Sequence, residues 1–125
     1  MMHVTDDEFK KMVEEAVTSI PERFASHLNN VAFMVADEPS PGQLRAGGIL
    51  HGHMTLLGLY EGIPLPKRNN GYSGVLPDVI TIFKHPHEAT EANFESLRRA
   101  VHQTVWHEVA HYFGLNHGQI HALED

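Results

Sequence analysis

The sequence contains no cysteine among its 125 residues. Without cysteine the chain can form neither disulfide bonds nor thiolate metal sites, and it has no thiol to serve as a nucleophile. Disulfide frameworks are typical of secreted domains, so their absence favours an intracellular protein. The first eight residues also lack the basic start and the apolar stretch of a secretory signal peptide. Both observations lead us to expect a cytoplasmic location.

Positive charge and long apolar runs are scarce as well. The chain has 9 Lys and Arg residues against 16 Asp and Glu residues, a net charge of -7 when histidine is neutral. Binding to nucleic acid or to anionic lipids needs clustered positive charge. A membrane helix needs about 20 consecutive apolar residues, and no run in the sequence approaches that length. We therefore expect neither a nucleic-acid partner nor a membrane partner.

Histidine, by contrast, is abundant, with 11 copies. Metal binding, pH sensing and acid–base chemistry all use this side chain. A chain of 125 residues suits one hydrophobic core, so we predict that residues 1–125 form a single domain. The functional question is therefore which of the histidines come together within that domain.

Apolar residues at helical spacing predict an amphipathic helix near each end of the chain. Thr5 followed by Glu8 is a capping-box pattern, and apolar residues recur at helical spacing from Phe9 to Ile20. Residues 90–113 contain neither proline nor glycine, which predicts one long helix of about 24 residues. The apolar face of this helix is formed by Phe94, Leu97, Val101, Val105 and Val109.

Short apolar runs between the two helices predict strands. The three runs are residues 31–36, 56–60 and 79–83. The first is almost continuously apolar, which predicts a buried strand. Residues 37–42 contain two prolines and a glycine and are predicted to form a loop. A second short helix is predicted to begin at Pro21, with Phe24 and Leu28 facing inwards, and to end at Asn29 and Asn30.

The most informative pattern lies at the end of the long helix, where residues 107–117 read HExxHxxGxxH. With about 100° of rotation per residue, His107 and His111 lie one turn apart on one helix face, so their imidazoles can converge on one ion. Glu108 lies one step around the helix and can reach water beside that ion. Given the composition, HExxH alone is expected by chance about 0.08 times, and the full pattern about 0.0005 times.

The glycine in the pattern has a geometric role. If the helix continued, His117 would lie about 9 Å beyond His111 and point about 120° away from it. The chain must therefore turn back before His117 can reach the same ion. Gly114 is the residue type that lets a helix end in a left-handed conformation.

Three neutral imidazoles without a thiolate suit one Zn²⁺ ion, and a fourth position left to water makes such a site catalytic in type. We therefore predict that His107, His111 and His117 bind zinc. Glu108 is predicted to be the general base, which takes a proton from water and passes it to the leaving amine. The sequence thus predicts a zinc-dependent metallopeptidase that hydrolyses peptide or amide bonds of a peptide or protein substrate.

The pattern resembles the zinc-binding consensus of the metzincin metallopeptidases. From about Phe9 onwards the chain resembles a family of short, mostly bacterial proteins, described as predicted zinc-dependent proteases with a matrix-metalloprotease-like domain. The matching stretches are residues 30–39, 57–65, 72–78 and 107–114. The resemblance implies an α+β class and a minimal zincin-like fold, in which a small mixed sheet packs on an N-terminal helix and on a long C-terminal active-site helix. Many family members carry aspartate where this chain has His117.

The chain departs from true metzincins in lacking their methionine turn downstream of the third ligand. All five methionines precede residue 107, and eight residues follow His117. We therefore expect a cleft that is shallow, or that a partner protein or a second copy of the chain completes. The same departure keeps a second function open, a non-enzymatic metal-binding or adaptor protein that retains the site. Hydrolysis of a small amide or ester is a third.

The remaining histidines are predicted to contribute less. His121 follows His117 by four residues and is an alternative or supporting ligand if the tail turns helical again. His102 points about 140° away from His107 and is predicted to lie on the surface or to pack. Two pairs with two-residue spacing are interpreted as solvated loop histidines, with an accessory metal site as the alternative. These pairs are His51 with His53 and His85 with His87.

Other polar groups are candidates for contacts with a substrate. The hydroxyl groups of Tyr60, Tyr72 and Tyr112 are candidates to hydrogen-bond a tetrahedral intermediate, and simple packing is the alternative for each. The strand at residues 56–60 is expected to be an edge strand near the cleft, where an extended peptide can add by main-chain pairing.

Overall fold

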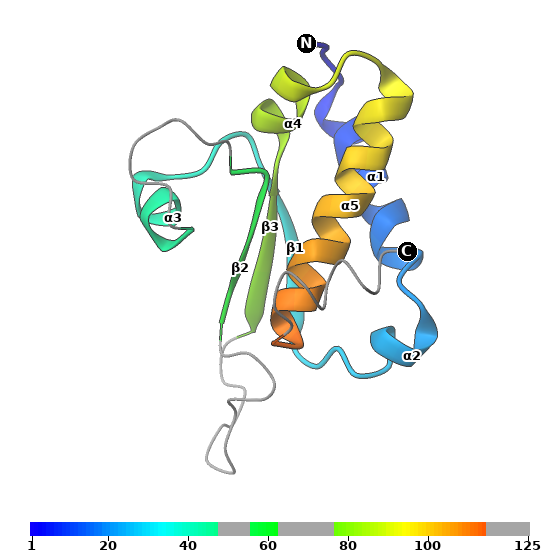
Figure 1. Ribbon diagram of the computed structural model, residues 1–125, viewed down its shortest axis with the longest axis vertical. Coiled ribbons are helices and arrows are strands. Elements are labelled where there is room, and N and C mark those ends of the chain that lie inside the picture. Colours follow the sequence, from blue (N-terminus) through cyan, green and yellow to red (C-terminus); the bar gives the residue numbers. More distant parts are fainter. Residues whose placement is uncertain (48–55, 63–76, 115–125) are drawn as a thin grey trace.

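The computed structural model describes residues 1–47, 56–62 and 77–114, shown in colour in Figure 1. The elements in this part of the chain are α1 (Asp6–Thr18), α2 (Glu22–Ala25), β1 (Val31–Ala36), α3 (Pro41–Ala46), β2 (Gly58–Glu61), β3 (Asp78–Phe83), α4 (Lys84–Thr90) and α5 (Phe94–Tyr112). None of these helices is long and apolar enough to cross a membrane.

The strands form a small mixed sheet in the order β1-β3-β2. Strand β1 runs parallel to β3, with Val31 paired to Asp78, and β2 runs antiparallel to β3, with Gly58 paired to Ile82. Helix α5 packs against α1 and also against β2 and β3, so both helices lie on the same side of the sheet (Figure 1). The predicted α+β class, with a small mixed sheet against an N-terminal and a long C-terminal helix, is confirmed.

The first helix forms as the sequence predicts. Thr5 caps α1 by accepting a hydrogen bond from the backbone N–H of Glu8, and the Glu8 carboxylate accepts one from the backbone N–H of Thr5. Four side chains at helical spacing are buried between α1, α5 and the sheet. They are Phe9, Met12, Val13 and Ala16.

Helix α5 has the predicted core face but a different beginning. Leu97, Val101, Val105 and Val109 are each at most 1% exposed. The helix begins at Phe94, and not at Thr90, because the Asn93 side chain accepts a hydrogen bond from the backbone N–H of Ser96 and caps the new helix there. Phe94 therefore lies at the exposed end of α5, with 47% of its surface accessible, and the prediction that it joins the core face was wrong.

Three other local predictions need correction. Strand β1 is not buried, because it forms one edge of the described sheet and exposes 53% of Met34 and 37% of Val35. The predicted loop at residues 37–42 is partly helical, because Ser40 and Gln43 form a capping box and Pro41 begins α3. Proline fits there because the first helical N–H needs no partner within the helix. Helix α2 ends at Ala25, earlier than predicted.

Candidate metal and catalytic site

His107 and His111 lie side by side on α5, as the four-residue spacing predicts. Their ring centroids are 4.9 Å apart and the ring planes are inclined by 72°. Both residues are half-buried, and the His111 side chain is 38% exposed. The helix thus brings two imidazoles to one accessible face, which is the arrangement that a shared metal ion requires.

Glu108 is buried between α5 and the sheet, with only 6% of its surface exposed. Its Oε1 atom accepts a hydrogen bond of 2.9 Å from the backbone N–H of Tyr60 in β2. The same oxygen lies 3.2 Å from Nδ1 of His111. A buried carboxylate needs such donors to offset its loss of hydration, and here one of them comes from a strand 48 residues away in sequence.

The contact with Glu108 determines the state of the His111 ring. A carboxylate can only accept at this distance, so Nδ1 of His111 is the nitrogen that carries a proton. In the neutral ring the lone pair then resides on Nε2, the arrangement typical of a metal-binding histidine held by a carboxylate. The hydrogen bond to Glu108 also raises the pKa of His111, although partial burial opposes the shift.

A glycine in β2 allows this close approach of strand and helix. A Cβ atom added at Gly58 would lie 2.7 Å from Cγ2 of Thr104 and 3.3 Å from Cγ of Glu108. The first distance is shorter than real Cβ contacts allow, so any side chain here would push β2 away from α5. Gly58 is therefore a condition for the hydrogen bond between Tyr60 and Glu108.

Tyr60 also holds the sheet beneath the site through its side chain. Its hydroxyl donates a hydrogen bond of 2.6 Å to Oδ2 of Asp78, a carboxylate residue that is 3% exposed. Its ring packs edge-on against the ring of Tyr112, with centroids 6.1 Å apart. Tyr60 thus contacts Glu108 through its backbone N–H, and it contacts Asp78 and Tyr112 through its side chain. The sequence suggested Tyr60 for its hydroxyl and contained no signal for this backbone role.

Of the other two tyrosine candidates, Tyr72 and Tyr112, the structure describes only Tyr112. Tyr112 is fully buried, and its hydroxyl donates to the carbonyl of His27 at 3.2 Å and accepts from the backbone N–H of Asn29 at 3.1 Å. These bonds connect the end of α5 to the segment before β1. Of the two alternatives for Tyr112, simple packing is therefore the one that the structure supports. Tyr72 lies outside the described residues.

The end of α5 has the predicted form. The helix ends at Tyr112, and Gly114 follows with a φ of 74°, in the left-handed region that favours glycine. His117 and His121 lie outside the described residues, as do His51 and His53. Within residues 1–47, 56–62 and 77–114 no three potential ligands gather into one metal site. Two imidazoles and a held carboxylate nevertheless match the donor types that zinc prefers, so the described residues fit that ion.

His87 overturns the interpretation of the second histidine pair as solvated loop residues. It lies in α4 and is fully buried, whereas His85 is exposed. Nδ1 of His87 donates to the Phe83 carbonyl at 2.8 Å, and Nε2 lies 2.8 Å from the Thr104 hydroxyl. Burial lowers the pKa of His87. The Thr104 side chain that contacts Gly58 thus also contacts His87, which packs behind the site as a structural residue.

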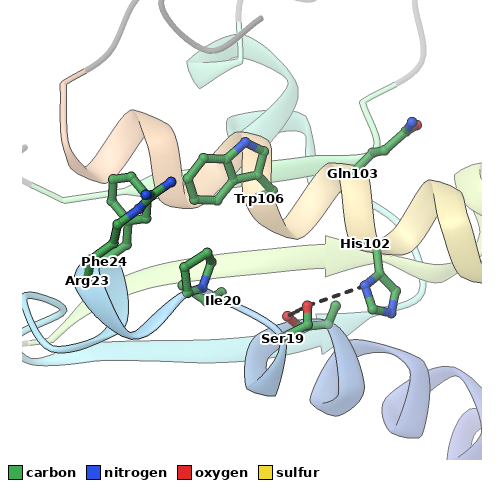
Figure 2. Close-up of a pocket in the computed structure, with 9 residues that line it drawn as sticks. Ser19, Ile20, Arg23, Phe24, His102, Gln103 and Trp106 are labelled. Carbon is green, nitrogen blue, oxygen red and sulfur yellow. Dashed lines mark hydrogen bonds between the residues drawn. The ribbon is translucent and has the colours of Figure 1, made fainter. Parts of the chain in front are cut away.

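His102 packs away from the metal face, as predicted. It lines a hollow of about 330 Å³ between α5 and the segment that joins α1 to α2 (Figure 2). Its Nδ1 atom is 3.4 Å from the Ser19 hydroxyl and its Nε2 atom is 3.4 Å from the Glu15 carboxylate. Trp106 and Phe24 meet edge-on in the same hollow. These contacts join α5 to α1 and α2 and leave His102 no part in the candidate site.

Comparison with known proteins identifies a family. A model of the family described as zincin-like metallopeptidase matches residues 28–125. The match begins just before β1, so it includes the whole sheet and all of α5, while α1 and α2 precede it. No curated protein matches the chain.

Proposed function

Because the chain belongs to the zincin-like metallopeptidase family, we propose that it is a zinc-dependent peptidase whose site is built on α5 and β2. His107, His111 and His117 would hold one Zn²⁺ ion. Glu108 would be the general base. The observation that carries the assignment of Glu108 is its hydrogen bond to the Tyr60 amide, which holds a buried carboxylate beside the His107–His111 face.

The chain's own groups account for the movement of the proton. Zinc, when bound, supplies Lewis acidity that polarises a carbonyl group and lowers the pKa of water. Oε1 of Glu108 is already engaged by Tyr60 and His111. We therefore assign the proton to Oε2, which takes it from the attacking water and returns it to the leaving amine. The fixed Oε1 atom keeps the carboxylate in one orientation during both transfers.

The outer edge of β2 in the described sheet is the proposed binding surface for an extended peptide. The backbone N–H of Phe83 donates to the Leu57 carbonyl, so Leu57 and every second residue after it pair with β3. Gly58 and Tyr60 therefore turn their backbone groups towards the outer edge, where the Tyr60 N–H is already bound by Glu108 and Gly58 provides the groups for pairing with a peptide. A peptide added antiparallel to β2 would have its main chain beside this carboxylate.

Metal analysis of protein purified without added zinc is the first test. We expect about one equivalent of zinc, and less than about half an equivalent that does not increase on reconstitution would contradict the site. His117→Ala should weaken zinc binding strongly, whereas His121→Ala should not. Unchanged zinc affinity in His117→Ala would assign the third ligand to another residue.

Turnover of a peptide library tests the general base. Glu108→Gln keeps the size of the side chain and removes its basicity, so we expect a loss of turnover of about 10²–10⁴-fold with zinc still bound. Glu22→Gln, an exposed change in α2, is the matched control and should retain full activity. Zinc binding without turnover of any peptide would favour the adaptor function. Turnover of small amides or esters, without turnover of any peptide, would indicate an enzyme that hydrolyses small molecules.

A further inference from the structure

The β1 edge of the sheet, as far as the structure describes that sheet, has the properties of a dimer interface. Strand β1 has the sequence VAFMVA, with no charge, proline or glycine. Unprotected apolar edge strands readily pair with other strands, and proteins usually protect them with charge or proline. Met34 and Val35 in β1 are two of the exposed large apolar side chains among the described residues. We propose that β1 pairs antiparallel with β1 of a second copy of this chain.

The hydrogen bonds to β3 determine which groups β1 turns outwards. The backbone N–H of Asp78 donates to the Asn30 carbonyl at 2.9 Å. Since backbone groups alternate along a strand, the even-numbered residues of β1 pair with β3. Val31, Phe33 and Val35 then direct their N–H and C=O groups to the outer edge. Two copies can join only by opposing these residues.

A two-fold axis through Phe33 satisfies this condition. In that register Val31 lies opposite Val35 of the second copy and the two Phe33 residues oppose each other, which gives about six hydrogen bonds. On the other face of the sheet Ala32 lies opposite Met34 of the second copy, so a small side chain meets a large one. Asp37 lies opposite Asn29 of the second copy, and no two like charges are opposed along the strand.

The groove beside β1 supports the same partner. A hollow of about 630 Å³ lies between α1 and β1 and is lined in part by Phe33 and Val35, which leaves room on the helix side of the edge. Lys10 and Glu14 of α1 line the same groove. The symmetry would place the two α1 helices antiparallel, an orientation that allows Lys10 of each copy to pair with Glu14 of the other. The net charge of -7 per chain opposes association, but salt at about 0.15 M screens this repulsion beyond about 8 Å.

Such a dimer leaves the proposed site accessible. Strand β1 lies at the opposite edge of the sheet from β2. Pairing through β1 would produce a continuous sheet with β2 at both outer ends. The proposal therefore does not depend on peptidase activity, and its failure would leave the proposed function untouched.

Sedimentation equilibrium at micromolar concentrations tests the oligomeric state. We expect a mass twice the 14.0 kDa of the chain. Val35→Pro should give a monomer, because it removes an outward N–H while leaving the bonds to β3 intact. Val35→Thr keeps the shape and the N–H and should remain a dimer. A monomeric wild-type chain, or a dimeric Val35→Pro variant that has retained its circular dichroism spectrum, would overturn the proposal.

Cysteine cross-linking tests the register and does not depend on the proline variant. The chain has no cysteine of its own. In the proposed register the Cα atoms of Ala32 and of Met34 in the second copy are about 4.5 Å apart, a distance that suits a disulfide. An oxidised mixture of Ala32→Cys and Met34→Cys chains should therefore cross-link, and neither variant should do so alone. Cross-linking of Met34→Cys by itself, or no cross-linking in the mixture, would contradict the two-fold arrangement through Phe33.

Discussion

The two edges of the small sheet have opposite characters, although only one strand separates them. At the β2 edge the outward N–H of Tyr60 is bound by Glu108, and Gly58 packs closely against α5. At the β1 edge helix α1 packs less closely against the strand and leaves a groove of about 630 Å³ beside exposed apolar side chains. Close helix packing thus creates a rigid edge suited to chemistry, and looser packing creates an edge suited to association.

The strongest test of this contrast is to separate β2 from α5. Gly58→Ala places a methyl group against Thr104 and Glu108, so the strand must move and the Tyr60–Glu108 hydrogen bond must lengthen. We expect kcat to fall by about 10- to 100-fold, because small displacements of catalytic groups are costly. Zinc affinity, measured by competition with a chelator, should be unchanged.

Gly42→Ala is the control for this substitution. Its Cβ would lie 3.8 Å from its nearest neighbours, so kcat should stay at the wild-type value, and stability should not fall because alanine favours a helix more than glycine does. Wild-type kcat in Gly58→Ala would mean that the close packing of β2 does not position Glu108.

A smaller effect is expected from removing the hydroxyl beneath the site. Tyr60→Phe leaves the buried Asp78 carboxylate without its 2.6 Å hydrogen bond. The free energy of unfolding should fall by about 1–3 kcal/mol, the usual cost of taking a hydrogen-bond donor away from a buried polar group. Urea denaturation measures this difference. An unchanged midpoint would show that other donors fully replace the Tyr60 hydroxyl.

Acidification should weaken the packing behind β2 through His87. Burial lowers the pKa of His87 in the folded chain below its ordinary value of 6.5, so the unfolded chain binds the proton more readily. His87 therefore stabilises the fold above pH 6.5, and this contribution is lost as the pH falls below that value. The loss should approach about 1.4 kcal/mol per pH unit.

Comparison of the wild type with His87→Gln isolates this contribution from the carboxylates, which titrate at lower pH. The difference in the free energy of unfolding between the two should shrink as the pH falls from 7 towards 5. His85→Gln, at the exposed neighbouring histidine, should show a pH dependence like that of the wild type. A constant difference between His87→Gln and the wild type would contradict the buried neutral state of His87.

The smallest effect is expected at the β1 edge. Met34 is 53% exposed, so Met34→Ser should change the stability of the monomer by no more than about 0.5 kcal/mol. Thermal unfolding at high dilution, where any dimer dissociates, is the suitable measurement. A larger loss would mean that Met34 is already packed within one chain, and the contrast between the two edges would weaken.

Sequence periodicity predicted the parts of the fold that depend on local patterns. The buried face of α5 and the neighbouring rings of His107 and His111 follow from helical spacing. The end of the helix at Gly114 follows from the conformational freedom of glycine. In these cases the residues that interact lie within one or two turns of each other, so one sequence is enough to place them.

The features that escaped prediction depend on contacts between distant residues. Helix α4 was not predicted because Pro86 between two histidines is typical of a loop, yet proline is tolerated in a first helical turn. The burial of His87 depends on Thr104, 17 residues away. The edge position of β1 depends on strand order, which apolar content does not reveal. The Tyr60–Glu108 bond likewise joins residues that no local pattern connects.

The hydrogen bond that the Tyr60 backbone N–H donates to Glu108 also limits how chains can assemble. A head-to-tail contact between β1 of one molecule and β2 of the next would repeat without end and grow into a filament. That contact would lack the Tyr60 donor, which points to Glu108 within its own chain. Two β1 strands can instead satisfy each other and close. The hydrogen bond that orients the proposed general base would thereby also disfavour open-ended polymerisation.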